Sequence, residues 1–232
     1  MQHFINSVLR IVKWPVAVLS VLLLPGGCLA FVGVVLAVAG AWEPMTPFLL
    51  GAGAYMVAWY FFFRRPGMGS VLSTLEHEIT HSVLALATFH MVTSLKTSWS
   101  EGGHMTFRGE GNWLIAIAPY FFPTLSLAVM FAMVWVDPGH LPIASGILGA
   151  TFTYHATSTY RETHRQQTDL IQVGFPFAWC FLPGANVVSY GLILSAARAG
   201  VSGSQGFLLN TWQHTLDLAT HLQGLAGGQP VG

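Results

Sequence analysis

The chain has 232 residues, of which 53% are apolar and only 8% carry a charge. A soluble globular domain has about 25% charged residues, so this composition excludes an ordinary soluble domain and also a disordered chain. Nine basic and nine acidic side chains cancel to zero net charge, which leaves no basic face for nucleic acid. The mean hydropathy of +0.58 favours one compact domain, residues 1–232, in a lipid bilayer.

Six apolar runs are candidate membrane helices, because a transmembrane helix needs about 20 mainly apolar residues. The runs cover residues 15–42, 46–63, 67–91, 113–136, 141–160 and 170–197. They predict an all-α polytopic membrane protein with about six transmembrane helices and a C-terminal tail over residues 198–232. Five basic residues would lie on one side of the membrane and four on the other, so their distribution does not fix the orientation.

The first run is preceded by basic residues and contains Pro25-Gly26-Gly27-Cys28. This arrangement is similar to a lipoprotein signal, but the apolar run continues to Trp42, beyond the length of a signal segment. We therefore expect a membrane helix that is kinked at Pro25. Cys28 and Cys180 both lie in apolar runs, so they do not suggest a disulfide framework.

Residues 92–112 are more polar than the runs on either side. Imperfect alternation on both sides of Glu101-Gly102-Gly103 predicts a β-hairpin over residues 94–108, with these three residues as the turn. The alternative is an irregular polar loop.

The third run contains the sequence EHEITH at residues 76–81. Charged side chains at the bilayer centre cost roughly 2.5–3.5 kcal/mol each, so they face a protein interior or a cavity and suggest a function. His77 and His81 are four residues apart and share one face of a helix, so both can bind one metal ion. Glu78 lies beside them and can act as general base on a zinc-activated water, which is the chemistry of the HExxH pattern. Glu76 is expected to orient an imidazole or to line a cavity, and the alternative for the motif is a polar patch packed between helices.

A catalytic zinc site needs a third protein ligand. The candidates are Asp169, His104, His155, His164 and His90. His90 is nine residues beyond His81 and would face the opposite side of the helix. Asp169 follows a polar stretch and opens the sixth run, where an aspartate is also favoured by the helix dipole alone.

These features resemble the site-2-protease-type intramembrane zinc metallopeptidases. The resemblance rests on HEITH at 77–81 in an apolar helix, on Gly102-Gly103-His104 with the later Gly111-Asn112-Trp113 and Ala118-Pro119-Tyr120, and on Gln167-Thr168-Asp169-Leu170. It covers about residues 67–175, the expected catalytic core. It implies that His77, His81 and Asp169 bind Zn²⁺, that Glu78 is the general base, and that Asn112 stabilises an oxyanion.

The function expected from motif and resemblance is that of a zinc-dependent metalloendopeptidase, which hydrolyses peptide bonds in or near transmembrane segments of membrane proteins. We expect an integral, multi-pass protein of a bacterial cytoplasmic membrane, with the lipid bilayer and a membrane-protein substrate as its partners. The alternative is a non-proteolytic membrane protein, a transporter or a scaffold, whose histidines hold a metal without turnover. Transporters often contain repeated halves, and no repeat is visible in the sequence.

Overall fold

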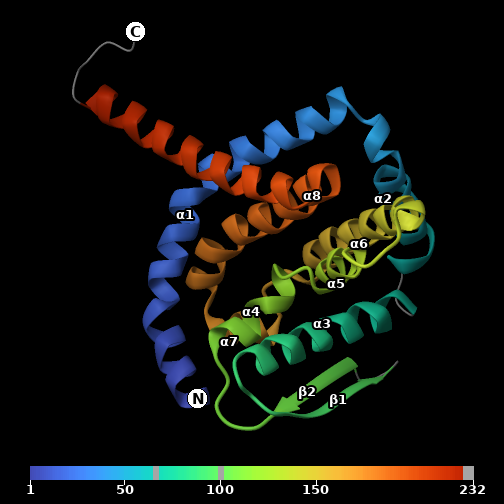
Figure 1. Cartoon of the computed structure of the whole chain (residues 1–232). Helices are drawn as coiled ribbons and strands as arrows, with labels where there is room; N and C mark the ends of the chain where they lie inside the picture. The colour runs from blue at the N-terminus through green and yellow to red at the C-terminus, as the bar shows by residue number, and fades with distance from the viewer. Residues whose placement is uncertain (65–67, 99–101, 227–232) are drawn as a thin grey trace. The chain divides into compact units, whose positions relative to one another are not determined.

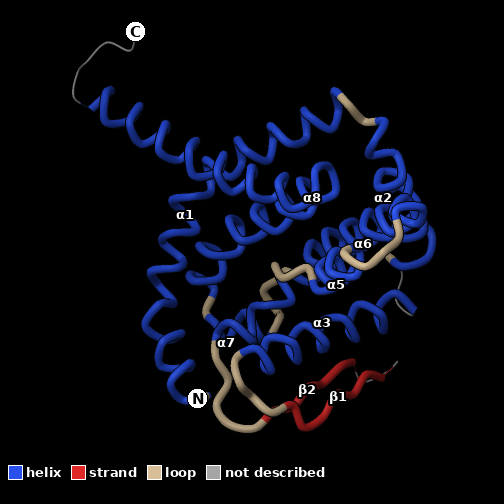
Figure 2. The backbone as a smooth tube through the Cα atoms, viewed as in Figure 1, coloured by secondary structure: helices blue, strands red, loops and turns tan. Residues whose placement is uncertain are grey.

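The computed structural model describes residues 1–64, 68–98 and 102–226, and it describes no side chains for residues 65–70 and 99–102. The chain is mostly helical, with one two-stranded hairpin (Figures 1 and 2). The helices are α1 (Gln2–Gly40), α2 (Thr46–Ala58), α3 (Met68–Ala87), α4 (Trp113–Ile117), α5 (Thr124–Met133), α6 (Leu141–Glu162), α7 (Thr168–Val173) and α8 (Phe175–Ala226), and the strands are β1 (Val92–Ser98) and β2 (Gly102–Phe107).

The chain divides into two compact units. The first unit consists of residues 1–15 and 46–179 and contains α2 to α7 and the hairpin. The second unit consists of residues 16–45 and 180–232, which supply most of α1 and most of α8. The expected catalytic core, residues 67–175, therefore falls within the first unit.

The second unit is held together by small residues that let helix backbones approach closely. A Cβ atom on Gly26 of α1 would collide with the backbone of α8 at Thr211, and one on Gly184 of α8 would collide with the Ser20 carbonyl of α1. The Ser20 hydroxyl also donates a hydrogen bond to the Phe181 carbonyl at 2.7 Å. Close packing through small residues is the usual way in which membrane helices associate.

Close packing through glycine also joins α2 to α6 in the first unit. Added Cβ atoms on Gly51 and Gly149 would collide with backbone atoms of the facing helix at Gly146 and Phe48. The two helix backbones are therefore in contact, and α6 is anchored along its first half. Its C-terminal residue, Glu162, reaches the site described below.

The hairpin packs along α3, as Figure 1 shows, and both strands contact that helix. Lys96 lies opposite His104 in the antiparallel register. The hairpin prediction is confirmed, although β1 begins two residues before the predicted range 94–108 and β2 ends one residue before the end of that range. Gly102 and Gly103 belong to β2 rather than to the turn, and the predicted turn residue Glu101 lies outside the described residues.

An apolar cluster fixes the end of α3 against α4 and the hairpin. Its buried members are Leu84 and Ala85 of α3 with Ile115 of α4 and Ala118, and side chains of both strands pack against them. The polar residues of α3 lie about one and two turns before this cluster, so the cluster determines how the motif faces the neighbouring elements.

The prediction of six membrane-spanning helices is not confirmed. Within the described residues, three helical segments are long and apolar enough to cross a membrane: α1, residues 43–63 including α2, and α8. The segment 113–133 is bent by 79° at its break and makes a fourth if it counts as one span. The runs at 67–91 and 141–160 do form helices, α3 and α6, but polar residues lower the hydropathy of both.

The expected C-terminal tail is helical up to Ala226, because α8 continues through it. The backbone leaves helical geometry at Ala199 and Gly200, and Gly200 has a φ of 61°, which favours glycine. The residues after Ala226 lie outside the described part of the chain.

Candidate metal centre

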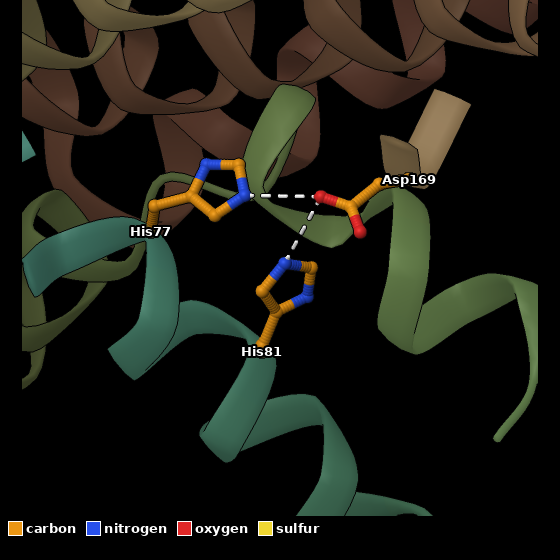
Figure 3. A group of neighbouring side chains, drawn as sticks. All are labelled: His77, His81 and Asp169. Atoms are coloured by element: carbon orange, nitrogen blue, oxygen red, sulfur yellow. Dashed lines mark hydrogen bonds and ion pairs between the residues drawn. The ribbon is translucent and has the colours of Figure 1, made fainter. Parts of the chain in front are cut away.

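Helix α3 places His77 and His81 one turn apart, with their ring centroids 4.7 Å from each other. Asp169, in the first turn of α7, directs its carboxylate between the two rings (Figure 3). Its Oδ2 atom lies 3.2 Å from His77 Nε2 and 3.4 Å from His81 Nε2. One ligand atom from each residue lies within 4.8 Å of the other two, so the three side chains could hold one metal ion. The fold thus brings together the three residues expected to bind metal.

The second ring nitrogen of each histidine, Nδ1, lies within hydrogen-bond distance of an oxygen atom. His77 Nδ1 is 2.9 Å from Glu162 Oε2, and His81 Nδ1 is 2.8 Å from the Ile115 carbonyl oxygen. A carbonyl oxygen can only accept, so Nδ1 of His81 carries the proton and leaves Nε2 with a lone pair that faces the centre. Such outer hydrogen bonds fix the tautomer and ring orientation of metal-binding histidines.

Glu162 is a residue whose role could not be recognised in the sequence. Ser73 Oγ donates a hydrogen bond to Glu162 Oε1, and Ser158 Oγ donates another at 3.2 Å. These bonds leave Oε2 directed at His77. The sequence offered one weak signal, an acidic residue at the end of an apolar run, but its distance to His77 depends on how α6 packs.

The role expected for Glu76 belongs to Glu162. Glu76 is buried on another part of α3, where its carboxylate accepts a hydrogen bond from Thr80 Oγ1 at 3.1 Å. It does not line the cavity at the centre. The neighbouring residue along the helix, Glu78, does line that cavity. The two glutamates on either side of His77 therefore have different surroundings.

Three polar side chains surround the Asp169 carboxylate. The Tyr120 hydroxyl donates a hydrogen bond to Oδ2 at 3.2 Å, in addition to the contacts of His77 and His81. Burial raises the pKa of the Asp169 carboxyl, but the interactions with His77 and His81 outweigh burial and hold this pKa well below its usual value. Asp169 is therefore an anion at neutral pH, as a metal ligand must be.

A cavity of about 630 Å³ opens at the three residues. Its lining includes Glu78, residues 103–105 of β2, and the segment 161–169. Glu78 approaches the hairpin at Gly103, where an added Cβ would lie 2.7 Å from Glu78 Cγ and 2.9 Å from Glu78 Oε1. The same Cβ would also collide with Thr74 Cγ2, so glycine at this point of β2 leaves room for both Thr74 and Glu78.

Asn112 lines the same cavity and caps α4. Its Oδ1 accepts a hydrogen bond from the Ile115 N–H at 3.1 Å, and its Nδ2 donates one to Asn6 Oδ1 at 3.0 Å. An amide group has two N–H donors. The cap therefore explains the position of Asn112, and its catalytic role stays a prediction.

The other four candidates for the third ligand are outside the group. His104 and His164 line the cavity, but they do not belong to the cluster of ligand atoms found among the described residues. His90 has its two ring nitrogens 3.0 Å from Thr88 Oγ1 and 2.9 Å from the Glu110 carbonyl oxygen. His155 is buried in α6 and does not line the cavity.

Comparison of the chain with protein-family models, with curated proteins and with solved structures finds no match. The functional argument therefore depends on the chemistry of the site itself. Two imidazole nitrogens and one carboxylate oxygen, each held by further hydrogen bonds, form a donor set of the type that proteins use for zinc.

Replacement of Glu162 by Gln should weaken metal binding roughly 10- to 100-fold, because the ring of His77 loses its charged partner. Glu110→Gln is the matched control, since the Glu110 side chain is exposed and lies outside the cavity lining. Metal affinity is measured by competition with a fluorescent zinc chelator in detergent. Equal affinities of the Glu162→Gln protein and the wild type would contradict the role of Glu162.

Proposed function

We propose that the chain is an intramembrane zinc metalloprotease, which hydrolyses peptide bonds in or near transmembrane segments of membrane proteins. The observation that carries this proposal is the position of Glu78 in the same cavity as His77, His81 and Asp169. A metal-holding protein needs only the three ligands. A hydrolase also needs a general base beside them, and Glu78 satisfies that need.

The donor set supports zinc as the metal. Zinc is bound in hydrolases by three protein ligands drawn from His, Asp and Glu, with one position left for water. When bound, a zinc ion polarises the scissile carbonyl and lowers the pKa of water to about 7. His77, His81 and Asp169 would hold it, and Glu162 and the Ile115 carbonyl would keep the two imidazoles in place.

The side chains of the cavity have distinct roles in this mechanism. Glu78 accepts a proton from the attacking water and passes it to the leaving amine. Asn112 uses its second N–H to share the negative charge that develops on the carbonyl oxygen, while the first remains with Asn6. Polar residues of the segment 161–169 keep the cavity hydrated, so that water reaches the peptide bond.

Membrane insertion of α3 and α6 follows from the same proposal. The two helices have 20 and 22 residues, which is long enough to cross a bilayer. Several of their polar side chains, among them Glu76, His81 and His155, are buried inside the first unit, as intramembrane polar residues are when they serve a function. The chain is then an integral, multi-pass protein, and a bacterial cytoplasmic membrane is its proposed location.

The hairpin gives the proposed substrate a place to bind. A membrane helix must unwind before cleavage, because its backbone amides are closed by internal hydrogen bonds. Strand β2 lines the cavity through residues 103–105. An unwound stretch can add to a strand edge through main-chain hydrogen bonds, which makes few demands on its side chains.

The test is cleavage of a labelled single-span membrane protein by the purified chain in liposomes. We expect cleavage to stop when a chelator removes the metal and to return when zinc is added, because the three ligands alone do not activate water. A magnesium addition serves as the control. Zinc binding without cleavage of any single-span substrate would contradict the protease and favour the non-proteolytic metal-binding protein.

A further inference from the structure

A second cavity, of about 240 Å³, adjoins the metal-site cavity on the side of α1. The two cavities have Gly111, Asn112, Ala116 and Gln172 in common. A ligand that occupies the first cavity can therefore continue into the second without leaving the protein surface. All residues that line the second cavity belong to the first unit.

Two basic side chains of α1, Arg10 and Lys13, line this second cavity and make it positively charged. Arg10 and Lys13 are three residues apart, so they share one face of the helix. Lys13 Nζ donates a hydrogen bond to the Val173 carbonyl at 2.8 Å and lies 4.9 Å from the centre of the Phe177 ring. The neutral carbonyl and the ring orient the ammonium group but do not neutralise it.

No carboxylate compensates these charges within the described residues. Every ion pair there involves a histidine, and neither Arg10 nor Lys13 is in one. Gln172 of α7 is exposed and lines both cavities, and its side chain makes no hydrogen bond with another described residue. The cavity thus offers two positive groups and an amide donor.

We propose that this basic pocket, defined by Arg10, Lys13 and Gln172, binds a carboxylate of the substrate, on an acidic side chain a few residues from the scissile bond. The inference rests on the proposed protease function. The connection to the cavity of Glu78 favours a peptide carboxylate over a lipid phosphate, because a chain that lies across the metal centre passes directly into the pocket. Charge-assisted hydrogen bonds from Arg and Lys are the strong ones for carboxylates.

The test uses single-span substrates that differ only in one residue, Glu or Gln, moved stepwise along each side of the cleavage site. In the wild type, Glu at one position should raise kcat/KM roughly 10-fold over Gln, as expected for a charged hydrogen bond. The ratio should fall to about one in the Arg10→Gln, Lys13→Met double variant. Met keeps the apolar stem of Lys13 in place, which protects the packing on Phe177.

Arg198→Gln is the matched control, because it also removes a positive charge but lies on α8 outside the pocket. Its Glu-to-Gln ratio should stay as in the wild type. Equal rates for all Glu and Gln substrates in the wild type would overturn the proposal. An unchanged preference in the double variant would also overturn it.

A binding measurement separates this inference from the protease itself. The zinc-loaded Glu78→Gln protein is titrated with fluorescently labelled forms of the same Glu and Gln substrates. The measurement is of binding, so no turnover is needed. A Glu preference that requires Arg10 and Lys13 supports the pocket even if the wild type cleaves nothing. The proposal would be overturned if Arg10 and Lys13 affected binding only through the anionic lipid content of the liposomes, with equal affinity for the Glu and Gln substrates. The pocket would then be a lipid site.

Discussion

Glu78→Gln is expected to lower turnover roughly 10²- to 10⁴-fold while zinc stays bound, because general-base catalysis contributes that much. Glutamine has nearly the size and polarity of glutamate, but its amide cannot accept the proton from the attacking water. Glu78 lies in the cavity without belonging to the cluster of ligand atoms. Metal content should therefore remain at the wild-type level.

Glu76→Gln is the matched control for this experiment. Glu76 is two residues away on the same helix and is buried outside the cavity, where a glutamine oxygen can still accept the hydrogen bond from Thr80. Its effect on turnover should be much milder. Cleavage is measured with a labelled single-span substrate in liposomes, at equal zinc occupancy. Wild-type rates in the Glu78→Gln protein would refute the proposed mechanism.

The second large effect is the loss of stoichiometric zinc when His77 and His81 are both replaced by Ala. Only the Asp169 carboxylate then remains of the three ligands, and a single carboxylate does not retain zinc. Asp169→Ala should also reduce the zinc content, since it removes the charged ligand. The measurement is the metal-to-protein ratio by mass spectrometry after dialysis.

His104→Ala and His164→Ala are the matched controls. Both histidines line the cavity, yet they are not in the cluster of ligand atoms. Their removal should leave one zinc per chain. Retained zinc in the His77→Ala, His81→Ala protein would reject the centre. Loss of His77 leaves the Glu162 carboxylate without one partner, so the folding of the variant must be checked separately. A sharp size-exclusion peak in detergent is that check.

The local features of this protein could be predicted from its sequence. The spacing of His77 and His81 and their apolar surroundings indicate a helix with both rings on one face, and α3 has that form. Alternation on both sides of a glycine pair indicated the hairpin, which the structure confirms. Such patterns depend on neighbouring residues, so they are visible in the chain itself.

The contacts between distant elements could not be predicted in the same way. Asp169 was one of five candidate ligands, and only the packing of distant elements, such as α7 on α4, places it beside the histidines. Glu162 is 85 residues from His77, and no pattern connects them. The count of six spans is not confirmed for a related reason, since the polar residues that α3 and α6 contribute to the site lower the hydropathy of both helices.

Gly103 has a consequence for recognising relatives of this chain. A Cβ at this position would collide with side-chain atoms of Thr74 and Glu78, so a larger residue there requires both side chains to move. A functional homologue can vary the rest of β2 and still conserve this glycine, 25 residues after the glutamate of HEITH. Under the proposed mechanism, homologues that lack both residues would be expected to keep the fold without hydrolytic activity.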